Sequence, residues 1–290
     1  MIFKQTGRKR NVRTVVTMGH FLKTACLFLC VVGILIVTLF RSEGVRFSGE
    51  RKQIRITAHR GASYGAPENT EAAVLLAIEE GADYVEIDVR MTADGIPVLL
   101  HDRALFRTTG IINYIDHVTY AELATYDAGG RYGEKYAGET VPDLKGILEA
   151  YGKKTSFNIE LKNGDDIRLV DAVVALIELY GLEERCVVTS ASYVQLEQVK
   201  RVNARIKTGY ILSLVYGEIY GYDAADFFSV RSGYVTESMI KQAHKQGKEV
   251  HAWTVNKAHE LKKMKEMGVD NVITDRPAYA RNVLEETMQH

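Results

Sequence analysis

The chain has 290 residues, and its 37 lysines and arginines balance its 37 aspartates and glutamates, so no net positive charge favours nucleic acid as a partner. Three cysteines are too few for a disulfide framework; Cys26 and Cys30 lie in an apolar stretch, which leaves Cys186 alone in the rest. Without the N-terminal segment, about 240 residues remain, which suits two ordinary domains or one α/β barrel.

The N-terminal segment has the pattern of a membrane anchor. Residues 1–20 form a basic tail, and residues 21–41 form an apolar stretch that is almost free of charge. As a helix this stretch is about 30 Å long, the thickness of the hydrocarbon core of a bilayer. A cleaved signal peptide is the main alternative, but its apolar region is shorter and ends in small residues, which "TLFRSEGVRF" lacks. We therefore expect a transmembrane helix at 21–41, a polar tether at 42–53 and a folded domain at 54–290.

The charges beside the apolar stretch favour one orientation in the membrane. The tail carries five lysines and arginines, which is typical of a cytoplasmic segment. The signal is imperfect, because Arg41, Arg46, Arg51 and Lys52 flank the other end. We expect a single-pass protein of the cell membrane, with its N-terminus in the cytoplasm and its folded domain outside.

Strand-like and helix-like segments alternate from residue 54 onwards. The strand-like segments cover residues 54–59, 84–89, 97–101, 156–161, 186–190, 206–211, 226–230, 249–254 and 271–275. Helical spacing, with a capping residue or a terminal glycine, marks residues 70–81, 165–181, 236–247 and 256–268. Strands that alternate with helices predict a mostly parallel sheet.

The strand at 97–101 does not fit a parallel sheet. Its connection to the preceding strand is too short for a parallel crossover, and Asp94-Gly95 is typical of a two-residue hairpin loop. Such a loop would pair Ala93 with Ile96.

The other eight strands are the number that a (β/α)₈ TIM barrel requires. If the hairpin has the register given above, it places Asp88 opposite His101. Residues 103–141 lack long periodic elements, and we expect them to form an insertion over the barrel mouth, after the strand that ends in His101-Asp102.

Polar side chains gather where several of these strands end, which is where barrels of this type have their active sites. Glu86 and Asp88 are two residues apart on one strand, so both point to the same face. The side chains that fall at strand ends are His59, Arg60, Glu86, Asp88, His101, Glu160, Lys162 and Trp253.

These residue types suit the chemistry of a phosphodiester. Three carboxylates at one mouth repel each other unless a cation lies between them, and an all-oxygen ligand set suits Ca²⁺, Mg²⁺ or Mn²⁺. Two histidines titrate near neutrality and can serve as general base and general acid. Arg60 and Lys162 can bind an anionic phosphate.

Five motifs in the same order resemble those of the glycerophosphodiester phosphodiesterases, a family of TIM barrels of the phospholipase C-like type. The resemblance runs from about Ile54 to Pro277. The motifs are "HRGASYGAPENT", "EIDVRMTADGIPVLLHD", "IELK", "AWTVN" and "ITDRP".

The resemblance implies a role for each of the polar residues at the mouth. It implies that Glu86, Asp88 and Glu160 bind one divalent cation, Ca²⁺ or Mg²⁺. It implies that His59 and His101 are catalytic. Arg60 and Lys162 would hold the phosphate, and Trp253 would pack against the substrate.

Structural interpretations of single residues remain open at this stage. A histidine at a strand end is usually structural. Glu86 and Asp88, taken alone, are also typical of an exposed strand face. Trp253, taken alone, is typical of a residue that packs in the core. We expect Asn69 or Thr70 to cap the helix that begins at 71. We also expect Glu68 and Asn69 to support the site residues from behind.

Two further groups of residues are interpreted as structural. The aromatic residues of the stretch "LVYGEIYGYDAADFF" follow the sixth barrel strand, where contact with lipid is possible, but packing within the loop is the preferred interpretation. His117, His244, His251 and His259 are interpreted as surface or packing residues.

We expect a membrane-anchored, metal-dependent enzyme that cleaves glycerophosphodiesters to glycerol 3-phosphate and an alcohol. The alternatives within the same class are a lysophospholipase D-like activity and the cleavage of a glycerol-phosphate polymer such as a teichoic acid. The alternative of a different class is an inactive, anchored barrel that only binds a ligand. The expected partners are a small or lipid-derived glycerophosphodiester and the membrane, with no nucleic acid.

Overall fold

The computed structural model describes residues 53–162, 164, 166–214 and 221–286. Among these residues, no helix is both long and apolar enough to cross a membrane. The tail at 1–20, the transmembrane helix at 21–41 and all but the last residue of the tether at 42–53 lie outside the described residues and stay predictions.

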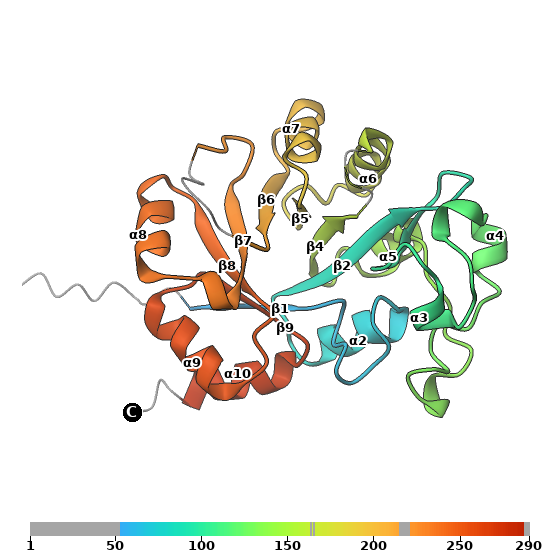
Figure 1. Ribbon diagram of the computed structural model, residues 1–290, viewed down its shortest axis with the longest axis horizontal. Coiled ribbons are helices and arrows are strands. Elements are labelled where there is room, and N and C mark those ends of the chain that lie inside the picture. Colours follow the sequence, from blue (N-terminus) through green and yellow to red (C-terminus); the bar gives the residue numbers. More distant parts are fainter. Residues whose placement is uncertain (1–52, 163, 165, 215–220, 287–290) are drawn as a thin grey trace, which may run out of the picture. The chain divides into compact units, whose positions relative to one another are not determined.

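The described part of the chain forms a closed barrel of eight parallel strands (Figure 1). Neighbouring strands pair in the order β1-β9-β8-β7-β6-β5-β4-β2, and β1 also pairs with β2, which closes the barrel. The predicted (β/α)₈ barrel is therefore confirmed. Its strands are β1 (Arg55–Ala58), β2 (Tyr84–Met91), β4 (Ser156–Leu161), β5 (Cys186–Ser190), β6 (Lys207–Leu212), β7 (Phe227–Arg231), β8 (Glu249–Trp253) and β9 (Asn271–Thr274).

Helices surround the strands on the outside of the barrel (Figure 1). The predicted caps are present: the Thr70 hydroxyl accepts from the N–H of Ala73 at 3.3 Å, and the Thr236 hydroxyl accepts from the N–H of Met239 at 3.2 Å. The helices are α2 (Glu71–Glu79), α5 (Leu144–Tyr151), α6 (Ile167–Leu179), α7 (Tyr193–Val202), α8 (Glu237–Lys245), α9 (Ala258–Met267) and α10 (Pro277–Glu286).

Strand β3 (Pro97–Leu99) folds back antiparallel on β2, as predicted, but the predicted loop is wrong. The loop has three residues, 93–95, because the N–H of Thr92 donates to the carbonyl of Ile96 at 3.1 Å. The Thr92 hydroxyl also accepts from the N–H of Ile96 at 3.0 Å and donates to Asp94 at 2.6 Å. Gly95 has a φ of +81°, which suits the last position of such a loop.

The longer loop shifts the hairpin register by one residue. The observed partners are Val89 with Leu99 and Met91 with Pro97. The N–H of Leu100, and not a group of His101, donates to the carbonyl of Asp88 at 2.9 Å. The predicted pairing of Asp88 with His101 is therefore wrong, and His101 follows the end of β3 instead of pairing within the hairpin.

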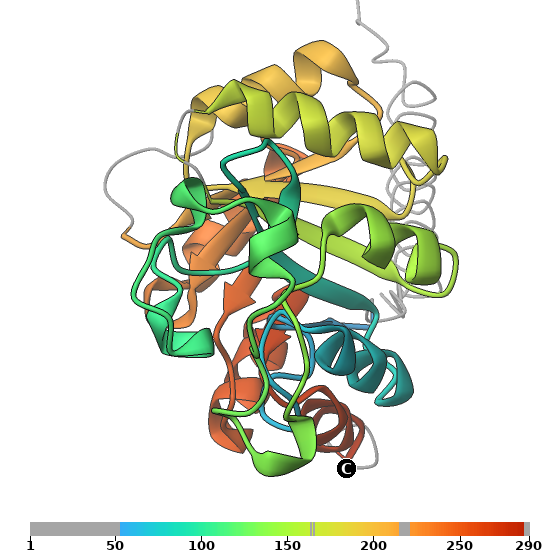
Figure 2. The ribbon, with the colours of Figure 1, turned by 90° about the vertical axis from the view of Figure 1, so that its right-hand side faces the viewer.

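Residues 103–141 form the predicted insertion, which contains short elements only (Figure 2, green). These elements are α3 (Phe106–Thr109), a 3₁₀ turn at Ile115–His117, α4 (Tyr120–Leu123) and a second 3₁₀ turn at Glu134–Tyr136. The insertion packs together with the β3 segment around a small hydrophobic core. That core contains Val98, Leu100, Leu105, Ile115, Val118, Leu123, Ala128 and Val141.

The aromatic stretch after β6 is described only in part, since Tyr216 and Tyr220 lie outside the described residues. The ring centroid of Tyr222 lies 4.8 Å from that of Tyr193 and 4.9 Å from that of Tyr210. Phe227 and Phe228 are buried in the barrel. For the described aromatic residues, the packing interpretation is therefore correct.

Candidate functional site

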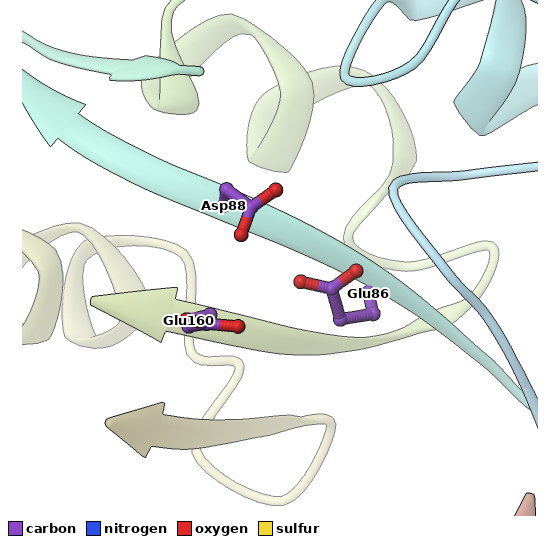
Figure 3. Close-up of side chains that lie close together, drawn as sticks. All are labelled: Glu86, Asp88 and Glu160. Carbon is purple, nitrogen blue, oxygen red and sulfur yellow. The ribbon is translucent and has the colours of Figure 1, made fainter. Parts of the chain in front are cut away.

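Three carboxylates from two neighbouring strands meet at the mouth of the barrel (Figure 3). Glu86 and Asp88 lie on β2, and Glu160 lies on β4, where it pairs in register with Asp88. One oxygen from each carboxylate lies within 4.8 Å of the other two. The predicted convergence of the three residues is therefore present in the structure.

The pKa values of the three carboxyl groups shift in different directions because their surroundings differ. Burial raises the pKa of Glu86 well above its usual range, and the charges of Asp88 and Glu160 raise it further. Burial and Asp88 likewise raise the pKa of Glu160, although Lys162 opposes this. Burial acts to raise the pKa of Asp88 too, but the positive charges of Lys162 and Arg60 outweigh it and lower that pKa.

One oxygen of Glu86 is the strongest indication that a cation fits here. Oε2 of Glu86 accepts a hydrogen bond from the backbone N–H of Arg60 at 2.7 Å. Oε1 is buried and has no hydrogen-bond partner among the described residues. A buried carboxylate oxygen without a donor is unfavourable, and a hard cation is the natural ligand of such an oxygen set.

Arg60 reaches the site through an unusual backbone turn at "HRG". Arg60 has a φ of 55° and Gly61 a φ of 79°, so the chain turns sharply after β1. A Cβ atom at Gly61 would lie 2.6 Å from atoms of Ala73, which explains the glycine. The guanidinium of Arg60 then lies 3.4 Å from Asp88 and donates to Glu68 at 2.9 Å.

Lys162 supplies the second positive charge beside the carboxylates. Its ammonium group donates to Oε1 of Glu160 at 2.6 Å and lies 3.5 Å from Oδ1 of Asp88. These contacts raise the pKa of Lys162, although burial alone would lower it, so the side chain stays charged. Arg60 and Lys162 together flank the three carboxylates with two fixed positive groups.

Asn69 holds Asp88 in place and does not cap a helix. Its side-chain amide donates to Oδ2 of Asp88 at 2.8 Å, and its side-chain carbonyl accepts from the N–H of Asp88 at 3.0 Å. Thr70 is the residue that caps α2. Glu68 accepts hydrogen bonds from Arg60 and from Arg107 of α3, so both predicted supporting residues contact the site from behind.

Each histidine is held by an aspartate through the same ring nitrogen. Nδ1 of His59 lies 2.6 Å from Oδ1 of Asp275, and Nδ1 of His101 lies 2.7 Å from Oδ1 of Asp102. Nε2 of each ring is then left for the cavity that both residues line. Burial lowers the pKa of His101, and the charges of Lys162 and Arg60 act in the same direction.

Sequence reasoning did not identify the residues that hold these histidines. The amide of Asn256 donates to Oδ2 of Asp275 at 2.6 Å. The sequence predicts that a helix begins at Asn256, but α9 begins at Ala258. Arg107 forms ion pairs with both Asp102 and Glu68. The only signal in the sequence was that Asp275 and Asp102 lie within quoted motifs, "ITDRP" and "LLHD".

A cavity of about 280 Å³, here called the mouth cavity, brings most of the predicted residues together. Asp88 does not line it and is buried, with 1% of its surface exposed. The indole N–H of Trp253 donates to the carbonyl of Ser229 at 3.0 Å, which fixes the ring at the wall. The predicted residues that line the cavity are His59, Arg60, Glu86, His101, Glu160, Lys162 and Trp253.

Comparison with known proteins agrees with this geometry. The profile of the "Glycerophosphoryl diester phosphodiesterase family" matches residues 59–279. The chain is 33% identical over 237 residues to a protein of Caldanaerobacter subterraneus named glycerophosphodiester phosphodiesterase, which covers 79% of this chain and 97% of that protein. It is 31% identical over 241 residues to a Bacillus altitudinis protein of the same name, covering 80% and 98%.

Solved structures resemble the barrel as well. An Oleispira antarctica phosphodiesterase, solved in complex with the product sn-glycerol-3-phosphate, matches with a TM-score of 0.76 and 30% identity over 80% of this chain and 96% of that one. A glycerophosphodiester phosphodiesterase of Agrobacterium tumefaciens matches with a TM-score of 0.69 and 29% identity, over 79% and 99%. Since the family match spans the barrel and every residue predicted to form its site, the chain belongs to the glycerophosphoryl diester phosphodiesterase family.

Proposed function

We propose that the protein hydrolyses glycerophosphodiesters to glycerol 3-phosphate and an alcohol, and that it needs one divalent cation, Ca²⁺ or Mg²⁺. The observation that carries the proposal is the unpartnered Oε1 of Glu86, which lies in a cluster with Asp88 and Glu160 beside two histidines. The names of the relatives and the glycerol 3-phosphate bound to the Oleispira protein support the substrate class.

Glu86, Asp88 and Glu160 would hold the cation. When bound there, a divalent cation withdraws charge from a phosphoryl oxygen and stabilises the charge that develops during the reaction. Arg60 and Lys162 lie on either side of the same carboxylates and would bind the remaining phosphate oxygens. Trp253 lines the same cavity and would pack against the glycerol.

The two histidines would move the protons of the reaction. We assign His59 as the base that activates the attacking hydroxyl, either of water or of the substrate itself, and His101 as the acid that protonates the leaving alcohol. Asp275 and Asp102 fix Nδ1 of these rings, so each presents Nε2 to the reacting group. Both rings are held in the same way, and the order of the two roles rests on the family resemblance.

We also propose that residues 21–41 anchor the enzyme in the cell membrane, with the N-terminus in the cytoplasm and residues 54–290 outside. The support is the apolar stretch itself and the basic tail before it. An enzyme in that place would meet glycerophosphodiesters released from lipids or from an envelope polymer.

Release of glycerol 3-phosphate, or of lysophosphatidic acid where the substrate is lysophosphatidylcholine, tests the activity. The full chain in detergent is treated with chelator, supplied with Ca²⁺, Mg²⁺ or Mn²⁺, and given glycerophosphocholine, glycerophosphoethanolamine, lysophosphatidylcholine or poly(glycerol phosphate). We expect metal-dependent release from the first two at least. A lack of release from all four with every metal would leave the inactive binding barrel as the better interpretation.

A further inference from the structure

A second and larger cavity, here called the outer cavity, adjoins the mouth cavity. Its volume is about 570 Å³, and the two cavities share Lys162 in their walls. It lies between the end of β2, the insertion and the start of α6. The described residues that line it include four basic and two acidic side chains, namely Arg90, Arg103, Lys162, Arg168, Asp116 and Asp166.

Arg90 lines the outer cavity and contacts two residues that line the mouth cavity. It follows Glu86 and Asp88 on the same face of β2, two residues beyond Asp88. Its Nε donates to the carbonyl of His101 at 2.8 Å, and its Nη1 donates to the carbonyl of Lys162 at 3.3 Å. Arg90 therefore touches one of the catalytic candidates and lines the outer cavity as well.

Arg90 forms no close ion pair with a described carboxylate, in contrast to Arg103 and Arg168, although the charges of Asp88, Asp102 and Glu160 act on it from a greater distance. Arg103 forms a two-point ion pair with Asp116 at 2.9 and 2.7 Å, and Arg168 forms one with Asp166 at 3.0 and 2.9 Å. No described carboxylate lies within 4.0 Å of the Arg90 guanidinium, and its two hydrogen bonds leave Nη2 available.

Arg90 and Arg103 both line the outer cavity. The ion pair with Asp116 leaves Nη1 of Arg103 available for a further hydrogen bond. Two guanidinium groups with free donors on one cavity are the arrangement that binds a phosphate.

The position of His101 connects this cavity to the reaction. A phosphodiester in the mouth cavity has two arms, and the arm that leaves must lie beside the acid that protonates it. The backbone carbonyl of His101 accepts from Arg90, which lines the outer cavity, whereas Trp253 lies on β8. Glycerol against Trp253 would therefore direct the leaving alcohol towards the outer cavity.

We propose that the outer cavity binds the leaving alcohol and that Arg90 and Arg103 favour an alcohol that carries a phosphate group. This inference rests on the proposed function, because it assigns a second arm of the same substrate. It predicts a preference for diesters in which another phosphate follows the alcohol, as in a chain of phosphodiester units. Neutral and cationic alcohols would bind less well.

Three diesters with the same two-carbon alcohol test the preference. The alcohol carries a hydroxyl in 2-hydroxyethyl glycerophosphate, an ammonium in glycerophosphoethanolamine and a phosphate in 2-phosphoethyl glycerophosphate. Glycerol 3-phosphate release is measured for each with the full chain at saturating metal. We expect kcat/KM for the phosphate-bearing diester to exceed that for the hydroxyl-bearing one about tenfold, the value of a good charge-assisted hydrogen bond. High salt should reduce the ratio.

Variants of the insertion separate this charge effect from catalysis. Arg103→Gln should remove most of the preference, measured as the ratio of kcat/KM between the phosphate-bearing and the hydroxyl-bearing diester. Asp116→Asn should increase the preference, because it removes the opposing charge. Arg131→Gln is the matched control, since Arg131 belongs to the insertion, stacks on Phe106 and does not line the outer cavity.

The outcomes distinguish the two proposals. Equal kcat/KM for all three diesters, or a preference that Arg103→Gln does not change, would overturn the role of the outer cavity and leave the phosphodiesterase in place. No turnover of any of the three diesters would overturn the proposed function and the outer-cavity role with it.

Discussion

The carboxylate of Asp275 lies 2.6 Å from Nδ1 of His59, although the two residues are separated by 216 positions in the chain. Asp275 is itself held, because it accepts from the amide of Asn256 at 2.6 Å and from the hydroxyl of Ser63 at 3.3 Å. A carboxylate in this position fixes the tautomer and the direction of the ring, so Nε2 of His59 faces the mouth cavity. The strand-end histidine is thus positioned for proton transfer.

Asp275→Asn should lower kcat about 10²-fold and change KM little. Asparagine can donate to Nδ1, which would place the proton on Nε2 and prevent the ring from accepting one there. A positioned base contributes roughly 10²–10⁴-fold, which sets the scale of the loss. Steady-state kinetics on glycerophosphocholine measure the effect.

Ser63→Ala is the control for the Asp275 variant, because it removes only the long 3.3 Å hydrogen bond to the same carboxylate. Ser63→Ala should lower kcat far less than Asp275→Asn does. If Asp275→Asn keeps kcat within a factor of two or three of the wild type, Asp275 does not position His59 for catalysis.

Glu86→Gln should abolish metal-dependent activity and raise the melting temperature of the metal-free protein. The buried Glu86 carboxylate faces two other carboxylates, and a neutral amide removes that repulsion. In the wild type, Ca²⁺ or Mg²⁺ should raise the melting temperature, because a ligand that binds only the folded state stabilises it by about 2.7 kcal/mol at 100 times its Kd. Glu86→Gln should lose this response.

An exposed carboxylate provides the comparison for the metal experiment. Glu197 on α7 is exposed and remote from the mouth, so Glu197→Gln should keep both the activity and the metal-induced shift. Full activity of the wild type after chelation, or an unchanged metal response in Glu86→Gln, would contradict the assignment of this cluster as the metal site.

The alternation of strands and helices predicted the barrel, because parallel strands need long crossover connections. The ends of the helices could be predicted as well, because glycines and capping residues are local signals. The hairpin register was missed for a local reason too: Thr92 closes a three-residue loop with its side chain, which "DG" alone does not reveal. The partners of the histidines were missed because Asp275 and Arg107 meet the site only after folding. Asn256 has the pattern of a helix cap, but its side chain binds Asp275 and Thr274.

His251 should make the stability of the fold depend on pH. It is 4% exposed at the amino end of the barrel, stacked on Phe227 with ring centroids 4.0 Å apart and 3.2 Å from Glu249. Burial lowers its pKa, and the charge of Arg55 adds to this, while Glu249 and Asp270 oppose it.

The sign of the pH effect follows from linkage. Because the folded pKa of His251 is below the unfolded value of about 6.5, the unfolded state takes up the proton first as the pH falls. The stability contribution is therefore complete above about pH 6.5 and is lost as the pH falls towards the lower, folded pKa. Urea unfolding at several pH values should show a smaller loss of stability in His251→Gln than in the wild type. His259→Gln changes an exposed histidine, so its stability should depend on pH as that of the wild type does. If the free energy of unfolding depends on pH in the same way in the wild type and in both variants, the prediction is wrong.

The orientation of the proposed anchor can be measured on intact cells. If residues 54–290 lie outside, protease added to the medium should degrade the folded domain while a cytoplasmic marker stays intact. A tag at the N-terminus should be protected until the membrane is opened. A domain that resists protease until the cells are broken would show that the proposed orientation is wrong.

The leaving group of the substrate should separate the roles of His59 and His101. Loss of either imidazole should cost roughly 10²–10⁴-fold on a natural diester. An alkoxide leaves phosphorus poorly and needs a proton, whereas p-nitrophenolate leaves with little help. If His101 is the acid, His101→Ala should regain a large part of its lost activity on a p-nitrophenyl diester of glycerol phosphate.

His59→Ala should show no such recovery, because a base is needed whatever group leaves. Both side chains are partly exposed, 21% for His59 and 30% for His101, so truncation should cost little stability, and a thermal melt of each variant verifies this. Recovery of His59→Ala instead would reverse the two roles and keep the phosphodiesterase. Near-normal activity of both variants on the natural diester would exclude the histidine mechanism, because no other described imidazole lines the mouth cavity.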